Sequence, residues 1–123
     1  MLFRSTICEI HPQVIKKLHK WKQNKTNVIV LEGNWFDNVN QMSKYDGILF
    51  DTFEDATNAA QFPNLLHKIC KSNCLITWWN NLSKEYNEFN FKTTKFKEIE
   101  VNPPQNTYFN HNKYYMPQYI YCK

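Results

Sequence analysis

Apolar and polar residues alternate along this chain with two different periods, and the order of these periods predicts an α/β fold. Four short apolar or alternating runs predict strands: Leu2–Cys8, Asn27–Leu31, Ile48–Phe50 and Cys74–Trp79. Apolar residues recur at helical spacing in Pro12–Trp21, which begins with a proline suited to a first helical turn, and in Ala59–Lys71. Because strands that alternate with helices indicate βαβ units, we expect one mostly parallel sheet of buried strands with helices on its faces.

The C-terminal segments have a different pattern. Phe96–Val101 and Tyr114–Tyr121 alternate or run aromatic, and Pro103 and Pro104 separate them. We expect these two segments to form an antiparallel strand pair. With 123 residues, the chain 1–123 has the size of a single domain.

Composition excludes several classes of protein. Apolar residues make up 42% of the chain and aromatic residues 16%, which is enough for a core and excludes collagen, a coiled coil and a disordered tail. No apolar run approaches the roughly 20 residues that a membrane helix needs, and the N-terminus carries no signal-peptide pattern. We therefore expect a soluble, cytoplasmic protein with no membrane partner.

Charge and cysteine content narrow the partners further. The net charge is +4, and the basic residues are scattered, so we expect no specific nucleic-acid partner. The four cysteines form no C-x-x-C motif, and no histidine pair has zinc-finger spacing. Cys70 and Cys74 could share a helix face, but they lack further ligands nearby. We expect small buried thiols and no metal site.

Polar residues follow the predicted strands. These strand ends are Glu9, Glu32-Gly33-Asn34-Trp35, Asp51-Thr52 and Asn80-Asn81. In open parallel sheets, ligands bind beyond the carboxyl ends of the strands. A carboxylate there can accept hydrogen bonds from hydroxyl groups or face a cation, and it can equally cap the next helix. For Glu9 and Asp51, both interpretations stay open.

Taken in order, these strand ends resemble class I S-adenosylmethionine-dependent methyltransferases. They are most similar to the branch of guanidinoacetate N-methyltransferase and the protein arginine methyltransferases. The motifs that carry the resemblance are Glu9, Glu32–Trp35, Tyr45–Phe53, Gln61-Phe62, Pro103-Pro104 and Tyr114–Gln118. The resemblance covers nearly the whole chain and implies a partial Rossmann-like methyltransferase fold.

The resemblance implies a cofactor site for S-adenosyl-L-methionine. Glu9 would hold the ribose hydroxyls, because a carboxylate can accept two hydrogen bonds from a diol. Gly33, Asn34 and Trp35 would lie along the adenine, with Asn34 in place of the family's leucine. Asp51 is also placed among the cofactor-binding residues, because it would orient the attacking nitrogen toward the cofactor methyl group.

The resemblance also implies a substrate site for a guanidino small molecule or a protein arginine. Asp51 would face the guanidinium, whose planar fork of donors suits a carboxylate. Thr52 follows Asp51 in the same loop and is the second catalytic candidate. Asn80, Leu82 and Ser83 occupy the loop where the family grips the substrate carboxylate, although this sequence departs from the family there.

The family opens with a strand and a Gly-rich cofactor loop, which this sequence lacks. The chain has only two glycines and no G-x-G motif. We therefore expect an irregular sheet beside the Ile48–Phe50 strand and weak or no cofactor binding by the chain alone. Three functions stay open. The first is part of a guanidino N-methyltransferase whose N-terminal half comes from a separate chain. The second is an inactive methyltransferase-like remnant or binding module. The third is a small α/β interaction domain with accidental similarity.

Overall fold

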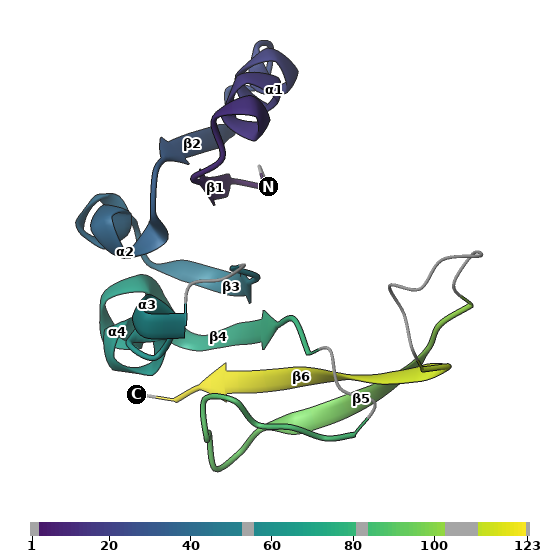
Figure 1. Ribbon diagram of the computed structural model, residues 1–123. Helices are drawn as coiled ribbons and strands as arrows, with labels where there is room; N and C mark the ends of the chain where they lie inside the picture. The colour runs from purple at the N-terminus through teal and green to yellow at the C-terminus, as the bar shows by residue number, and fades with distance from the viewer. Residues whose placement is uncertain (1–2, 53–55, 81–83, 103–110, 123) are drawn as a thin grey trace. The chain divides into compact units, whose positions relative to one another are not determined.

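The structure is a computed structural model, and it describes residues 3–52, 56–80, 84–102 and 111–122. The chain divides into two compact units, Met1–Ser43 and Lys44–Lys123, called here the N-terminal and C-terminal units (Figure 1). The strands are β1 (Ser5–Glu9), β2 (Val28–Glu32), β3 (Tyr45–Phe50), β4 (Cys70–Trp78), β5 (Lys95–Glu100) and β6 (Lys113–Tyr121). The helices are α1 (Pro12–Lys22), α2 (Trp35–Asn38), the 3-10 turn η1 (Val39–Gln41), α3 (Ala56–Ala59) and α4 (Phe62–Ile69).

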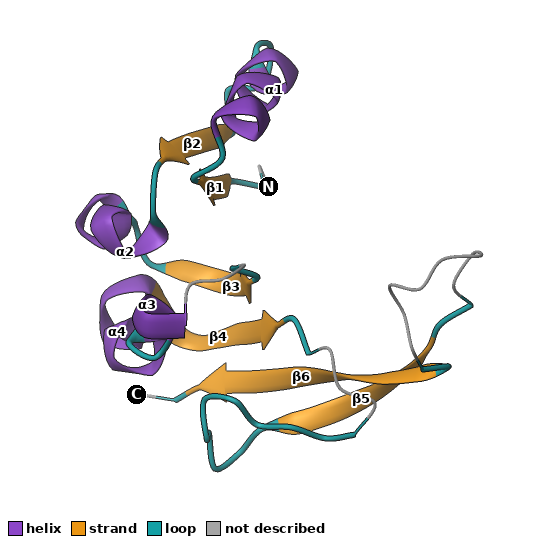
Figure 2. Cartoon of the chain, in the orientation of Figure 1, coloured by secondary structure: helices purple, strands orange, loops and turns teal. Residues whose placement is uncertain are grey.

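The N-terminal unit is one βαβ motif followed by a short helical segment. β1 and β2 are parallel, with a register that runs from Ser5 opposite Val28 to Glu9 opposite Glu32. α1 connects the two strands, begins at Pro12 and packs against β2. α2 and η1 follow β2 (Figure 2). The carboxyl ends of β1 and β2 therefore lie side by side.

The C-terminal unit is a four-stranded mixed sheet in the order β3-β4-β6-β5. β3 and β4 are parallel, and α3 and α4 connect them. β6 runs antiparallel to both β4 and β5, so it closes the sheet as a C-terminal antiparallel pair with β5. This arrangement gives the sheet one parallel pair and two antiparallel pairs.

Aromatic side chains form the core of the C-terminal unit. α4 buries Phe62, and the Phe62 ring stacks on Phe50 of β3 with 4.1 Å between ring centroids. Trp78 of β4 meets Phe89 edge-on at 5.1 Å, and Phe89 also contacts Phe62. The remaining buried residues of α4 and β4 are Leu66, Ile69, Cys70, Cys74 and Ile76. This core packs α4 against one face of the sheet.

The structure confirms the α/β order of elements and the terminal antiparallel pair, but not a single mostly parallel sheet. The described strands hydrogen-bond in two sheets, and the sheet of the C-terminal unit is mixed. β1 and β3 belong to different sheets, which fits the irregularity expected from a missing strand. The expectation of strands buried on both sides was wrong, because Ile29, Leu49 and Leu75 expose 55%, 67% and 45% of their surface. These exposed side chains leave part of each strand uncovered in the described residues, whereas parallel strands usually have both faces covered.

Three boundaries differ from the sequence prediction. The helix predicted over Ala59–Lys71 is two helices, and Cys70 already pairs with Tyr45 as the first residue of β4. β1 and β2 each extend one residue beyond the predicted runs, to Glu9 and Glu32. Trp35 begins α2 instead of belonging to a loop. None of the described helices is long and apolar enough to span a membrane.

Candidate functional site

The carboxylate of Glu9 is oriented by the backbone that follows it. Its Oε1 atom accepts hydrogen bonds from the backbone N–H groups of Ile10 (3.0 Å) and His11 (2.9 Å). These bonds hold the side chain at the carboxyl end of β1, just before α1. One carboxylate oxygen thus shapes the turn, and the carboxylate retains a second oxygen that can accept hydrogen bonds from a ligand.

Gly33 joins the ends of β1 and β2. Its backbone N–H donates to the carbonyl oxygen of Glu9 (2.8 Å). Its φ of +105° lies in the left-handed region that favours glycine, because side chains are strained there. Any substitution would therefore disturb the turn that places residue 33 beside Glu9.

Two asparagines shape the segment after Gly33. Asn34 caps α2, because its Oδ1 atom accepts from the backbone N–H of Phe36 (2.8 Å). Buried Asn38 donates from Nδ2 to the carbonyl oxygens of Glu32 (3.0 Å) and Asn34 (2.9 Å). The sequence analysis did not identify Asn38. The available signal was Asn34, because a capping asparagine can mark the start of the helix to which Asn38 belongs. Asn38 therefore fixes the backbone of the proposed cofactor segment.

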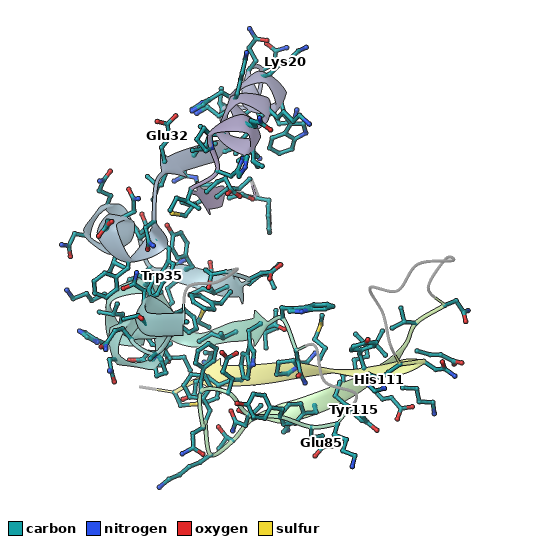
Figure 3. All side chains as sticks on the ribbon, viewed as in Figure 1. Lys20, Glu32, Trp35, Glu85, His111 and Tyr115 are labelled. Atoms are coloured by element: carbon teal, nitrogen blue, oxygen red, sulfur yellow. The ribbon has the colours of Figure 1, made fainter. Side chains whose placement is uncertain are left out.

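Trp35 and Glu32 complete this segment (Figure 3). The Trp35 ring is buried and meets Phe36 edge-on, with ring centroids 5.7 Å apart. Glu32 is exposed, and its Oε1 atom lies 2.6 Å from Nε2 of His19 on α1. The structure thus brings together Glu9, Gly33, Asn34 and Trp35 at the adjacent ends of β1 and β2.

Asp51 and Thr52 directly follow β3 in the C-terminal unit, and both are exposed. Phe50 pairs with Trp78, and the backbone N–H of Trp79 donates to the carbonyl oxygen of Phe50 (3.4 Å). This bond belongs to the last pair of the parallel ladder, Phe50 and Trp78. Asp51 lies at the carboxyl end of the parallel pair, where the sequence placed it.

The end of β4 is held against β6. Asn80 is buried, and its Nδ2 atom donates to the carbonyl oxygen of Tyr115 (2.9 Å). Trp79 stacks on Tyr114, with ring centroids 6.2 Å apart and an interplanar angle of 25°. Residues 81–83, which include the predicted substrate-loop residues Leu82 and Ser83, lie outside the described residues. The sequence did not single out Trp79, because it ends an apolar run that resembles an ordinary buried strand.

The buried thiols are on β4, away from its carboxyl end. Burial raises the pKa of Cys70 to about 12, and the neighbouring Cys74 adds to the shift. Burial likewise raises the pKa of Cys74. In the described part of the chain, no three His, Cys, Asp or Glu side chains are grouped so that they could hold a metal ion. The thiols are free and protonated at neutral pH.

Comparison with known proteins shows the family to which the chain is related. The model of the guanidinoacetate N-methyltransferase family matches residues 3–116. Protein arginine N-methyltransferase 2 of Saccharomyces cerevisiae is 29% identical over 149 aligned residues, covering 98% of this chain and 36% of the yeast protein. Its namesake from Candida glabrata is 45% identical over 56 residues, covering 40% of this chain and 13% of that protein. The chain therefore spans about a third of the yeast protein's length.

The fold agrees with this match. A solved structure from Escherichia coli, assigned as a methyltransferase, superposes with a TM-score of 0.66 at 14% identity. The superposition covers 94% of this chain and 63% of the E. coli chain, and at this identity it shows the fold alone. The family match covers most of the sequence, which excludes an accidental similarity. The chain belongs to the guanidinoacetate N-methyltransferase family.

Proposed function

We propose that this chain provides part of a S-adenosylmethionine-dependent N-methyltransferase that methylates a guanidino group. The observation that carries the proposal is the closed turn at the ends of β1 and β2. There, the Glu9 carboxylate is oriented by two backbone N–H groups, and the Glu9 backbone carbonyl accepts a hydrogen bond of 2.8 Å from the N–H of Gly33, a glycine with positive φ. Family membership supports methyl transfer as the chemistry, and the arginine methyltransferase relatives support a guanidino substrate.

The N-terminal unit fits the adenosine end of the cofactor, which supplies the methyl group when bound. Glu9 would accept hydrogen bonds from the ribose hydroxyls, and its orientation is already fixed by two backbone N–H groups. Gly33 has no side chain to obstruct a close approach to the backbone. Asn34 and Trp35 would border the adenine, with Asn38 holding their backbone in place.

Asp51 would hold the guanidinium of the substrate in the C-terminal unit. A carboxylate can accept two parallel N–H bonds from this planar group, and this fixes its orientation as well as its charge. Thr52 follows in the same exposed segment and would assist in positioning. The contribution of these residues is to align the attacking nitrogen, because correct alignment alone lowers the barrier of a transfer reaction.

We infer that both units belong to a single methyltransferase-like domain over residues 1–123, completed by a further strand and a Gly-rich loop. β1 and β3 each have one hydrogen-bonded strand neighbour among the described residues. Edge strands of parallel sheets rarely stay open, because unpaired backbone groups are costly when buried. Further polypeptide would supply this strand and loop. The alternative is a binding module without catalysis.

Titration calorimetry with S-adenosylmethionine tests the cofactor site. We expect the chain alone to bind in the millimolar range, because losing about 4 kcal/mol of contacts to a Gly-rich loop weakens a micromolar ligand about 1,000-fold. Glu9→Ala should weaken this binding further, and Asp51→Ala should leave it unchanged. Glu100→Ala at the end of β5 is the matched control. Micromolar binding by the chain alone would contradict the need for a Gly-rich loop, and no effect of Glu9→Ala would contradict the ribose assignment.

Transfer of a labelled methyl group tests the reaction. The chain is combined with a matching N-terminal half and offered guanidinoacetate or an arginine peptide. We expect transfer that Asp51→Ala abolishes. Cofactor binding without any transfer would favour the binding-module alternative.

A further inference from the structure

The sheet of the C-terminal unit has one face packed against α4 and one face with exposed apolar side chains. Phe50 of β3 stacks on Phe62 of α4, and Trp78, its partner in the ladder, is buried. Successive side chains of a strand point to opposite faces, and directly paired residues share a face. Leu49 and Thr77 pair with each other and precede Phe50 and Trp78. They therefore belong to the opposite face, called here the open face.

The ladder registers extend the open face across all four strands, whose order can be followed in Figure 1. Gly47 pairs with Leu75, and Leu75 pairs with Ile120. Alternate residues of β6 share the face of Ile120, and so do their partners in β5. The exposed side chains that these registers place on the open face are Leu49, Leu75, Ile120, Met116, Lys95 and Lys97.

Apolar side chains form a patch over β3, β4 and β6. Leu49, Leu75 and Ile120 expose 67%, 45% and 48% of their surface. Leu75 and Ile120 are direct partners, and Leu49 comes two residues after the partner of Leu75, so the three side chains are neighbours. Single exposed apolar residues need no explanation, whereas contiguous exposed apolar surface marks an interaction site.

Positive charge lies on the β5 side of this patch. Lys95 pairs with Gln118, and Lys97 pairs with Met116. The described strand residues that these registers place on the open face include no aspartate or glutamate. Glu98 belongs to the opposite face of β5, where its Oε1 atom lies 3.1 Å from Nζ of Lys113. The open face thus combines an apolar patch with two lysines along one side.

We propose that the open face binds an amphipathic helix of another protein, with the apolar stripe of the helix on the patch and two of its carboxylates over Lys95 and Lys97. Recognition of a helix through its apolar stripe is a common mode of binding. Neighbouring strands are about 4.8 Å apart, so β3 to β6 spans about 10 Å, which is the diameter of one helix. One helix lying along the strands therefore covers the patch and borders β5.

The two lysines determine which helix fits. Residues two apart in a strand are about 7 Å from each other, and side chains four apart in a helix are about 6 Å from each other. Glutamates at positions i and i+4 on one flank of the helix would therefore each meet one lysine. A second copy of this chain would bring only lysines and apolar residues to the open face, so charge favours an acidic partner over self-association. The binding does not depend on methyl transfer.

Nuclear magnetic resonance of the ¹⁵N-labelled full chain with two synthetic peptides tests the inference. Both peptides form helices of about 20 residues, with leucines at every third or fourth position. One carries two glutamates four residues apart beside the leucine stripe, and the other carries lysines at these two positions. We expect the glutamate peptide to shift the amide signals of Leu49, Leu75 and Ile120 saturably. The lysine peptide should bind about fivefold more weakly, and high salt should reduce this difference.

A leucine variant tests the apolar patch. Leu49→Ser should weaken binding of the glutamate peptide about fivefold, because the leucine side chain loses its burial under the helix. Ile29→Ser on β2 is the matched control, since Ile29 is exposed to a similar degree in the N-terminal unit, and binding should stay unchanged. Substitutions of such exposed side chains usually leave the fold intact. Should Leu49→Ser fail to fold, the comparison of the two peptides on the unaltered chain still decides.

A charge exchange tests the lysines. The double variant Lys95→Glu, Lys97→Glu should reverse the preference, so that the lysine peptide binds more tightly than the glutamate peptide. The control Lys16→Glu, Lys17→Glu changes two exposed lysines of α1 and alters the net charge equally. It should leave the preference for the glutamate peptide as it is.

Three results would overturn the inference. The first is equal binding of the two peptides, and the second is the absence of any saturable shift at Leu49, Leu75 and Ile120. The third is a dimer of the chain alone in sedimentation, with the same amide signals changing with protein concentration, which would make a second copy the occupant of the open face. None of these results bears on the proposed methyl transfer, which the Asp51→Ala variant tests separately.

Discussion

The two units begin from the same βαβ pattern but are stabilised differently. In the C-terminal unit, α4 buries Phe62, Leu66 and Ile69 against the sheet. In the N-terminal unit, α1 has no buried residue, and Val28 is the buried residue of β1 and β2. Both helices are amphipathic in sequence, so the helical pattern alone does not account for the difference in burial.

Hydrogen bonds hold the backbone of the N-terminal unit in place after β2, whereas aromatic packing holds the elements of the C-terminal unit together. The turn after β2 is fixed by the Asn38 side chain and by the bond from the Gly33 N–H to the Glu9 carbonyl, and the turn after β1 is fixed by the Glu9 carboxylate. The proposed cofactor residues therefore lie in the less strongly packed unit. A unit of this kind gains most from additional polypeptide or ligand, because whatever binds the folded form stabilises it.

The largest expected difference between the units concerns two phenylalanines. Phe62 exposes 1% of its surface, and Phe36 exposes 39%. Phe62→Ala should lower the free energy of unfolding by about 3–5 kcal/mol, because it leaves a cavity in the aromatic core. Phe36→Ala should cost less than about 1 kcal/mol. Urea unfolding followed by near-ultraviolet circular dichroism measures both.

An equal cost for the two substitutions would contradict this comparison. It would mean that the N-terminal unit has a core as demanding as that of the C-terminal unit. A third variant, Leu66→Ala on α4, checks that the large effect belongs to the core and not to the aromatic stack alone.

A smaller loss of stability is expected when the buried side-chain amide of Asn38 is removed from the N-terminal unit. Asn38→Ala leaves the carbonyl oxygens of Glu32 and Asn34 without their Nδ2 partner, which should cost about 1–3 kcal/mol. Hydrogen exchange should accelerate at the amides of β1 and β2 and stay unchanged in β4. The exposed Asn40 provides the control, since Asn40→Ala should alter neither. Faster exchange in β4 would show that the two units unfold together.

Sequence patterns predicted where the strands lie, but not the boundaries that tertiary contacts set. The runs around Val28–Leu31 and Ile48–Phe50 are strands because β-branched residues between turns have few alternatives. The helix predicted to Lys71 ends at Ile69 because Cys70 pairs with Tyr45, a tertiary contact with no local signal. Asn73, with a φ of 65°, lies in this irregular start of β4.

The candidate site was predictable to the extent that it depends on strand ends. Asp51 follows its strand as expected, because residues after a parallel strand are fixed by the end of the apolar run. Trp79 and Asn38 escaped prediction for a common reason. Their placement depends on the Phe50–Trp78 register and on backbone carbonyls of a turn, and neither leaves a pattern in the sequence.

The smallest expected effect is a loss of stability at alkaline pH that originates in the C-terminal unit. Burial raises the pKa of Cys70 to about 12, from an ordinary value of 9.0, so the fold favours the protonated thiol. This stabilisation is fully present below pH 9, where both states are protonated. It is lost as the pH rises toward 12, because the unfolded chain ionises first. At pH 10 the loss should be roughly 1 kcal/mol.

Urea unfolding of Cys70→Ala and Cys122→Ala at pH 7 and pH 10 measures this term. Cys122 is exposed and provides the matched cysteine control, whereas Cys70→Ala should flatten the pH dependence. Lysine and tyrosine side chains titrate in the same range, and their contribution cancels when the two variants are compared. Equal slopes for the two variants would mean that the unfolded and folded chains ionise the Cys70 thiol alike. The thiol would then be reached by solvent, and the packing of β4 against α4 would be looser than the core of the C-terminal unit requires.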